Sequence, residues 1–383
     1  MQYKERLFFA FLFLCFYFFQ SGFAQSDLKY DWGGALRFNY NFSDWKKDSK
    51  NKGGDFGFDV FRLNVKGAYR KISVDAEYRF YADSSGGPML KHGWFGYQFD
   101  TNHQLQVGLT QVPFGLLPVT SNNFFFNINY YLGLEDNYDM GIKYVYQKAG
   151  WQLYAAFFKN ADVLDFGDKS EISPDRYAYD IAGRNKQVNQ GNVQFNYNWR
   201  GSLTHQVGLS GLVGGIYNID THKTGLRKAL ALHYWLNYGN WDVKAQWTAY
   251  SMNAKNGEDE MGEQESKRVV TLGAYGGTYE VAAKGITYQF GLAYTLPIKK
   301  GIIDDIRFYN DFSMLHKTER VFKDSYQNVL GLLITAGPVF TYIDYAIGKN
   351  HAWFGNAWTS SFAQGDPAHK WNGRLNINMG YYF

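Results

Sequence analysis

The feature that most constrains this chain is the strict alternation of side-chain types over residues 371–383. Every second position is apolar: Leu375, Ile377, Met379, Tyr381 and Phe383. The positions between them hold Arg374, Asn376, Asn378, Gly380 and Tyr382. A period of two predicts a β-strand with one apolar face. Such a strand is compatible with a soluble sandwich, although the aromatic end at Phe383 is typical of a membrane-spanning barrel.

The clearest repeat of this alternation is a predicted hairpin over residues 61–81. After a tight turn at Arg70 and Lys71, the chain returns with the same period of two. The polar positions are Arg62, Asn64, Lys66 and Arg70 on the first strand and Asp75, Glu77 and Arg79 on the second. Turning such charges toward lipid would cost up to ~2 to 4 kcal/mol each near the bilayer midplane. The charged face is therefore predicted to line a wet interior.

Composition favours a transmembrane barrel over other membrane proteins. Aromatic residues make up 19% of the chain, yet the mean hydropathy is −0.40. Beyond the first 24 residues there is no run of ~18 apolar residues, the length that a membrane-spanning helix needs. A barrel hides its apolar residues at alternate positions, so its average stays polar. A large soluble all-β protein remains the alternative.

The first 24 residues have the pattern of a cleaved signal peptide. Lys4 and Arg6 precede an apolar run, and the small-residue exit ends at Ala24. Cys15, the single cysteine of the chain, lies inside this segment. We therefore expect a mature domain over residues 25–383 without a disulfide or a cysteine metal site. The formal net charge of +4 is too weak to indicate a nucleic-acid partner.

The lengths of the connections give the expected architecture. Alternating segments occur at 32–42, 61–70, 72–81, 104–110, 138–147, 151–160, 192–200, 205–217, 226–238 and 241–250. Short turns are expected at 100–103, 148–150, 201–204, 239–240, 297–301 and 336–338, and long loops at 161–186, 253–285 and 351–370. Short turns on one rim and long loops on the other predict an all-β, antiparallel, up-and-down transmembrane barrel with periplasmic turns and extracellular loops.

The strand count depends on the segment 268–279, which also has an extended pattern. Including it gives an odd number, whereas single-chain bacterial barrels have even counts. We therefore place it in the long loop, as a protruding hairpin arm, and predict about sixteen strands with eighteen as the alternative.

The loop over residues 112–137 is a candidate constriction. It contains Pro113, Phe114 and Gly115, the polar pair Asn122 and Asn123, and then three consecutive phenylalanines. Because so apolar a loop requires burial, it folds into its own barrel, packs in a groove of a neighbouring subunit, or lies over the rim. We expect the first, which would narrow a pore.

At this point the chain resembles the phosphate-selective porin O and P family, in a version such as Gram-negative Bacteroidota carry. The resemblance rests on residues 61–67 (FRLNVKG), residues 106–115 (QVGLTQVPFG) and the strand start at 139–142 (DMGI). It implies a sixteen-stranded trimeric porin of the cell outer membrane with an inward-folded third loop. The stacked arginines and lysine cluster of the phosphate-selective members cannot be matched residue by residue, so phosphate itself is not carried over.

The polar strand faces predict the residues that line the lumen. They are Arg37, Arg62, Lys66, Arg70, Asp75, Glu77, Arg79, Lys143, Lys244, Arg307 and Arg374. A row of cations on one strand favours a mild preference for anions. The alternative is that Asp75 and Glu77 neutralise the row as a cross-strand charge network, which leaves small polar solutes equally suitable.

Enzyme chemistry and cofactors are not expected. The eight histidines are scattered without metal-ligand spacing, and no nucleophile motif or phosphate-binding glycine loop occurs. The first strand begins soon after the signal segment, which leaves no plug domain. The predicted function is passive diffusion of small polar solutes or anions, and the alternative is a barrel that serves as a structural or adhesive loop platform. Expected partners are outer-membrane lipid, further copies in a homotrimer, and the barrel-assembly machinery, which would read the strand that ends at Phe383.

Overall fold

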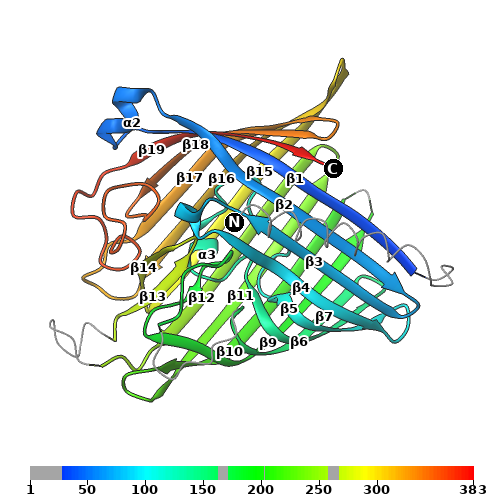
Figure 1. The fold of residues 1–383 in the computed structure, drawn as a ribbon, viewed down its shortest axis with the longest axis horizontal. Coiled ribbons are helices and arrows are strands. Elements are labelled where there is room, and N and C mark those ends of the chain that lie inside the picture. Colours follow the sequence, from blue (N-terminus) through cyan, green and yellow to red (C-terminus); the bar gives the residue numbers. More distant parts are fainter. Residues whose placement is uncertain (1–27, 163–170, 202, 258–266) are drawn as a thin grey trace, which may run out of the picture.

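Sixteen antiparallel strands close into a barrel in the computed structural model, which describes residues 28–162, 171–201, 203–257 and 267–383 (Figure 1). The first eight barrel strands are β1 (Leu28–Ser43), β2 (Asp55–Tyr69), β3 (Ile72–Phe80), β4 (Pro88–Gln98), β5 (His103–Gln111), β6 (Tyr138–Lys148), β7 (Trp151–Asn160) and β9 (Asn185–Arg200). The remaining eight are β10 (Thr204–Asn218), β11 (Thr224–Tyr238), β12 (Trp241–Asn253), β15 (Lys284–Lys300), β16 (Ile303–Lys317), β17 (Ser325–Ala336), β18 (Val339–Lys349) and β19 (Asn372–Tyr382). The predicted fold class is confirmed, with sixteen strands rather than eighteen. The signal segment and Cys15 lie outside the described residues.

The barrel closes where the last strand pairs with the first. The β1–β19 register runs from Ala35 opposite Tyr382 to Ser43 opposite Arg374. Gly34 and Phe383 exchange two backbone hydrogen bonds, of 2.8 and 3.1 Å. A Cβ at Gly34 would lie 2.6 Å from the Phe383 ring, so the ring packs directly on the bare backbone. The alternating segment at the chain end is therefore the closing strand.

The predicted β2–β3 hairpin is confirmed in its turn and its register. Tyr69 pairs with Ile72 around the two-residue turn, and Arg70 adopts the left-handed conformation there (φ 55°). On the face that points into the barrel, the cross-strand pairs are Arg62 with Arg79, Asn64 with Glu77 and Lys66 with Asp75. The apolar residues between these positions face outward, as the transfer cost of charge into lipid requires.

Aromatic side chains gather on the outer wall near both rims. At the short-turn rim the Trp151 ring packs 4.2 Å from Tyr197, and Trp241 packs 4.7 Å from Tyr294, measured between ring centroids. At the long-loop rim Tyr326 lies 5.9 Å from Trp371. Rings with an apolar body and a polar tip suit the two membrane interfaces.

The rims differ in the length of their connections, as predicted. The β15–β16 turn differs in position, because β15 continues past Pro297 to Lys300 through a register irregularity, and the turn follows at Gly301. A bulge tolerates proline, since the missing N–H is not needed there. Helix α2 (Lys47–Lys52) lies in the β1–β2 loop, 3₁₀-helix η1 (Asp83–Ser85) in the β3–β4 loop, and α3 (Ile128–Tyr131) in the β5–β6 loop. Among the described residues, no helix is long and apolar enough to cross a membrane.

The expected hairpin in the β12–β15 loop exists, but it does not protrude. Strands β13 (Val269–Ala274) and β14 (Gly277–Ala282) pair with each other, and β8 (Asp180–Ile181) joins them as a third strand outside the barrel sheet. Val270, Leu272 and Val281 are almost fully buried. The prediction of a protruding arm was wrong because these apolar side chains stabilise the hairpin only when it packs against other loops.

Candidate channel lumen

Loop 112–137 lies inside the barrel and is bound to its wall by hydrogen bonds. The backbone N–H of Gly115 donates to Ser210 Oγ at 2.8 Å, and that of Leu116 donates to Gln246 Oε1 at 2.8 Å. Gln194 of β9 donates to the carbonyl of Gly115. Gly115 has a φ of 69°, and a Cβ there would lie 2.7 Å from the Gln246 amide. A glycine is thus needed at this close approach.

The middle of the loop is held by one carboxylate of β16. Asp311 accepts hydrogen bonds from the backbone and side-chain amides of Asn122 (2.7 and 2.8 Å) and of Asn123 (3.1 and 2.6 Å). Arg307 donates to Asn122 Oδ1 at 2.8 Å and lies 3.3 Å from Asp242. Four hydrogen bonds to an ionised acceptor form a strong tether.

Strand β18 and a second position on β16 complete the attachment. The backbone N–H of Phe124 donates to Asp344 Oδ2 of β18 at 3.0 Å, and that of Ile128 donates to Ser313 Oγ of β16 at 3.2 Å. The loop therefore lies against the wall formed by β9 to β18, and the alternatives of a subunit groove or a rim position are wrong. The strands from β1 to β7 form the opposite side of the barrel, which we call the facing wall because it faces the loop.

Glu135 is a buried carboxyl inside this loop. It accepts hydrogen bonds from the hydroxyl of Thr120 (2.5 Å) and the side-chain amide of Asn127 (2.8 Å). Burial raises the pKa of Glu135 to about 7, although these hydrogen bonds act in the opposite direction. The group therefore titrates close to neutral pH.

The apolar part of the loop packs under the long loops. Ile128, Tyr131 and Leu132 belong to a cluster of buried residues that includes Tyr179, Ile181, Leu272, Tyr279 and Phe362. The Tyr131 ring lies 5.9 Å from the Phe362 ring, and the Tyr279 hydroxyl donates to the Tyr131 carbonyl at 2.7 Å. The loop and the long loops together form a cap over the β9 to β18 side of the long-loop end.

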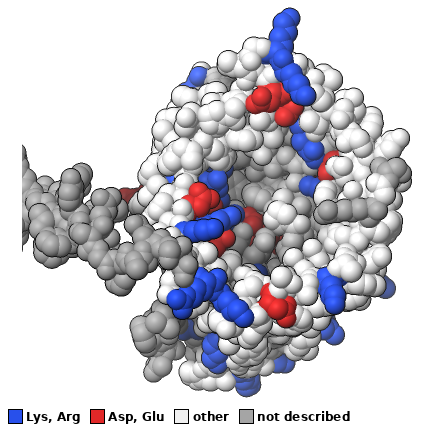
Figure 2. Space-filling view, turned by 90° about the vertical axis from the view of Figure 1, so that its right-hand side faces the viewer, with Lys and Arg blue, Asp and Glu red and all other residues white. Residues whose placement is uncertain are grey.

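The facing wall carries a mixed but mainly basic cluster. Arg37 lies 3.0 Å from Asp59. Glu77 lies 3.3 Å from Arg62 and 2.6 Å from Arg79. We call this set, with Lys91 and Asp136, the facing-wall cluster; Lys91 Nζ lies 3.6 Å from Asp136 Oδ2. Figure 2 views the molecule from the short-turn rim and shows a central hollow with basic and acidic side chains around it.

Aromatic rings from the loops cover the same cations. The guanidinium of Arg37 lies 5.6 Å from the Phe124 ring centroid, and that of Arg79 lies 4.4 Å from the Tyr177 ring. Tyr177 also donates to Asp136 Oδ2 at 2.6 Å. The loops and the facing wall thus meet through cation–π contacts and hydrogen bonds.

The other predicted residues occupy separate positions. Lys66 and Asp75 are cross-strand neighbours closer to the short-turn rim, and Asp75 lies 2.9 Å from His92. Lys143 is buried and donates to the carbonyl of Gln111 at 2.9 Å. Lys244 and Arg307 are on the loop-bearing wall, where Lys244 Nζ lies 3.4 Å from Asn122 Oδ1.

Arg70 and Arg374, two of the predicted lumen cations, lie outside the facing-wall cluster. Arg70 was predicted to extend the row of Arg62 and Lys66, but it is an exposed turn residue with positive φ, so the strand face ends before it. Arg374 is at the long-loop end, where its guanidinium lies 5.2, 5.9 and 5.8 Å from the rings of Trp45, Trp353 and Phe354.

Lys91, Asp59 and Asp136 belong to the cluster but were missed from the sequence. Asp59 is the extra residue at a bulge where Arg37 pairs with Val60 and Phe38 with Phe58. Lys91 is the extra residue at a second bulge, between Leu90 and His92. A bulge shifts the alternation by one position, which hides Asp59 and Lys91 from a period-two pattern, whereas Asp136 belongs to loop 112–137 and to no strand. In the described part of the chain, no group of three or more His, Cys, Asp or Glu residues could hold a metal ion.

No protein-family model matches this chain, and no curated protein matches it by sequence. Solved structures match it in fold. An anion-selective porin from Comamonas acidovorans aligns over 93% of this chain and 100% of its own, with a TM-score of 0.59 and 12% identity. The trimer form of OmpT, an outer membrane protein of Vibrio cholerae, aligns over 94% of this chain and 100% of its own, with a TM-score of 0.59 and 13% identity. The outer membrane channel DcaP of Acinetobacter baumannii aligns over 94% of this chain and 99% of its own, with a TM-score of 0.59 and 13% identity. At these identities the likeness establishes the barrel fold.

Proposed function

We propose that this protein is an outer-membrane porin, a water-filled channel through which small polar solutes and ions diffuse passively, with a preference for anions. One observation carries the proposal: an apolar outer wall surrounds a polar interior that is hollowed at the short-turn rim, and an internal loop bound to one wall narrows this interior toward a charged facing wall. An interior of this kind has no role in a barrel that only anchors loops, whereas it supplies the hydration and charge that a permeating ion needs.

The charges of the facing-wall cluster support the preference for anions. Its cations are Arg37, Arg62, Arg79 and Lys91, and its acids are Asp59, Glu77 and Asp136. Each of these acids forms an ion pair with at least one cation of the cluster. Four cations face three carboxylates, so the cluster carries a net positive charge of one, and a positive local potential favours a passing anion.

Planar-bilayer recording tests the channel. Purified protein is expected to give stepwise, ohmic openings, and a gradient of potassium chloride is expected to give a reversal potential with the sign of chloride selectivity. A cation-selective reversal potential would contradict the proposed lumen chemistry, and a silent barrel would contradict the channel itself. Liposome swelling with phosphate, sugars and amino acids then identifies the solute class, because phosphate remains one candidate among these.

A non-channel barrel that presents loops as a structural or adhesive platform is the second candidate. It is favoured by the cap, in which long-loop residues such as Ile181 and Leu272 pack on the internal loop and are almost fully buried. A rigid, packed loop surface is what a docking platform needs. The same bilayer experiment separates the two functions.

The location, family and assembly belong to the same proposal. The signal segment and the resemblance to the phosphate-selective porin O and P family support export to the outer membrane of a Gram-negative bacterium, with the long loops outside. The trimer form in which the related fold of OmpT was solved supports a homotrimer. Light scattering of the detergent-solubilised protein tests this assembly, and a monomeric mass would contradict it.

A further inference from the structure

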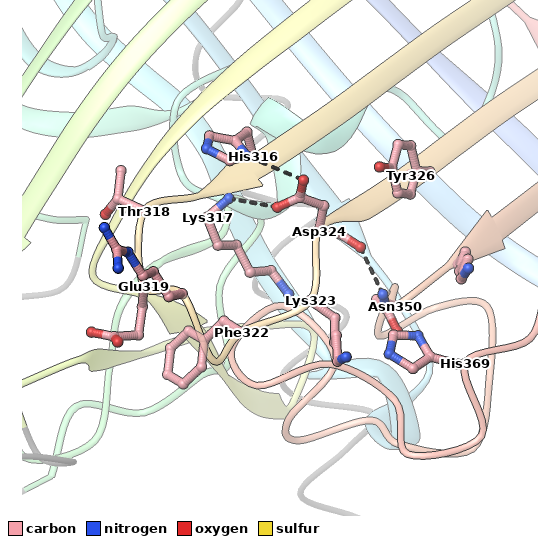
Figure 3. Close-up of a pocket in the computed structure, with 12 residues that line it drawn as sticks. His316, Lys317, Thr318, Glu319, Phe322, Lys323, Asp324, Tyr326, Asn350 and His369 are labelled. Atoms are coloured by element: carbon pink, nitrogen blue, oxygen red, sulfur yellow. Dashed lines mark hydrogen bonds and ion pairs between the residues drawn. The ribbon is translucent and has the colours of Figure 1, made fainter.

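A pocket of about 530 Å³ opens on the outer side of the long-loop rim, away from the lumen (Figure 3). Its lining comes from the ends of β16, β17 and β18, from the β16–β17 loop and from the β18–β19 loop. The charged and ionisable side chains around it are His316, Lys317, Glu319, Arg320, Lys323, Asp324, Lys349 and His369. The pocket is therefore rich in cations.

The acids at the pocket are already engaged. Glu319 Oε2 lies 3.3 Å from Arg268 Nε. Asp324 lies 3.1 Å from His316 and accepts the backbone N–H of Lys317 at 3.0 Å, as Figure 3 shows. Lys317 itself points inward and donates to the Ser361 carbonyl at 2.8 Å.

Three cations remain for a ligand. Within the part of the chain that the structure describes, no ion pair engages Arg320, Lys323 or Lys349. The three come from the β16–β17 loop and from the end of β18, so they approach the pocket from two sides. Such an arrangement suits a group with several acceptor oxygens, and phosphate is the common group of this kind.

The strand registers place the pocket at the level of a membrane interface. Tyr326 pairs with Met314 and with Lys349, and all three are on the outward face of the barrel. The exposed pair Leu330 and Tyr345 lies four residues along the strands from Tyr326 and Lys349, on the same lipid-facing wall. Lys349 is thus the first cation above the apolar belt.

An aromatic pair flanks the same position. The Trp371 ring, half exposed on the outer wall, lies 5.9 Å from the Tyr326 ring. Tryptophan and tyrosine beside a lysine, at the boundary between apolar and charged surface, are typical of contacts with lipid headgroups.

We propose that this pocket binds the phosphate of a lipid in the outer leaflet, with Arg320, Lys323 and Lys349 as its ligands and Trp371 and Tyr326 against the top of an acyl chain. The inference rests on the proposed membrane location and is independent of whether the barrel conducts. A free phosphate ion would use the same cations but would gain nothing from the aromatic pair or from the outward position of the pocket.

The test measures lipid retention by native mass spectrometry of the mature protein in detergent. The probes are diphosphoryl lipid A, the same lipid after enzymatic dephosphorylation, and inorganic phosphate. The test variant is Arg320→Gln/Lys323→Gln/Lys349→Gln. The control is Arg70→Gln/Lys71→Gln/Lys148→Gln, which removes one arginine and two lysines at the opposite rim.

We expect the wild type and the control to retain the phosphorylated lipid, and the test variant to need at least ~10-fold more lipid for equal occupancy. The Lys323→Arg/Lys349→Arg variant is expected to bind like the wild type, because it keeps both charges. Equal retention by the test variant, or equal binding of the dephosphorylated lipid, overturns the proposal. Displacement of the lipid by low millimolar inorganic phosphate assigns a free-anion site and overturns the lipid assignment.

Two further measurements distinguish a loss of lipid binding from misfolding and from a loss of channel function. The heat-dependent shift in electrophoretic mobility shows that each variant has folded into a barrel. Single-channel conductance of the test variant is expected to match the wild type, since its substitutions lie outside the lumen. Loss of conductance in every protein would reject the porin function while leaving the lipid measurement intact.

Discussion

At the scale of single residues, the facing-wall cluster joins four cations to three carboxylates within hydrogen-bonding distance. Isolated charges of this kind would be costly to bury, and paired charges contribute little net stability unless they are well hydrogen-bonded. Arg79 is 5% exposed and contacts both Glu77 and the Tyr177 ring. It therefore holds the cluster in place, whereas Arg37, Arg62 and Lys91 have more exposed side chains.

We predict that Arg62→Gln/Lys91→Gln lowers the chloride-to-potassium permeability ratio at least ~2-fold, because the remaining carboxylates then dominate the local potential. The measurement is the reversal potential in a potassium chloride gradient. Lys148→Gln, at the short-turn rim, serves as the control. An unchanged ratio in the double variant would show that these cations do not set selectivity.

The loop carboxyl Glu135 gives a pH dependence. Its pKa is raised to about 7 from an ordinary value of 4.5, so the protonated form is favoured in the docked loop. Its contribution to docking is therefore fully present below pH 4.5 and is lost as the pH rises through 7, by on the order of 3 kcal/mol. We expect more current fluctuation at pH 8 than at pH 5, and Glu135→Gln to remove the difference. Equal fluctuation of the wild type at both pH values would contradict this account.

At the scale of elements, the sequence is sufficient to predict a strand or a hairpin where the alternation of apolar and polar residues is unbroken. The β2–β3 hairpin, the closing strand and the inward position of loop 112–137 all follow from the need to separate apolar from charged side chains. No residue range was predicted for strand β4, since the bulge at Lys91 places Lys91 and His92 in succession and breaks the period. Asp59 was missed for the same reason.

The contacts between elements could not be predicted from the sequence. The tether from Asn122 and Asn123 to Asp311 joins positions 189 and 188 residues apart, and nothing in the local pattern around Asp311 indicates a partner. Arg70 was counted both in the predicted turn and on the strand face, and the structure places it in the turn. Tertiary contacts of this kind depend on which strands become neighbours, and local periodicity carries no such information.

The tether itself can be tested. Asp311→Ala removes the acceptor of four hydrogen bonds, each worth ~1.5 to 3 kcal/mol when the acceptor is charged, so the loop is expected to leave the wall part of the time. Conductance should become larger and noisier, and deletion of residues 119–131 should raise it further. Asp305→Ala, at the short-turn end of the same strand, is the control. Unchanged conductance in both loop variants would remove the loop from the constriction.

At the scale of the whole molecule, stability depends on the ring being complete. Every barrel strand has two neighbours, so no strand edge is left unpaired and the lipid-facing backbone is satisfied. Among the barrel strands that the structure describes, only the β1–β19 seam joins strands far apart in the sequence. It includes the backbone exchange between Gly34 and Phe383.

We predict that Gly34→Val prevents closure. Its Cβ would lie 2.5 Å from the Arg62 carbonyl and 2.6 Å from the Phe383 ring, which only a shift of the backbone relieves. The folded, heat-modifiable band on electrophoresis is expected to disappear. Gly57→Val in the neighbouring strand β2, where a Cβ meets nothing within 4 Å, is the matched control. A folded band for Gly34→Val would show that the seam tolerates a side chain.

The attachment of loop 112–137 also sets an order of events during assembly. Its anchors on β10, β16 and β18 lie 95, 189 and 220 residues further along the chain, so they do not yet exist as a surface when the loop emerges. The loop therefore stays unanchored until the later hairpins have joined the sheet. The opening is narrowed late in biogenesis, no earlier than the step in which β18 supplies the acceptor for Phe124.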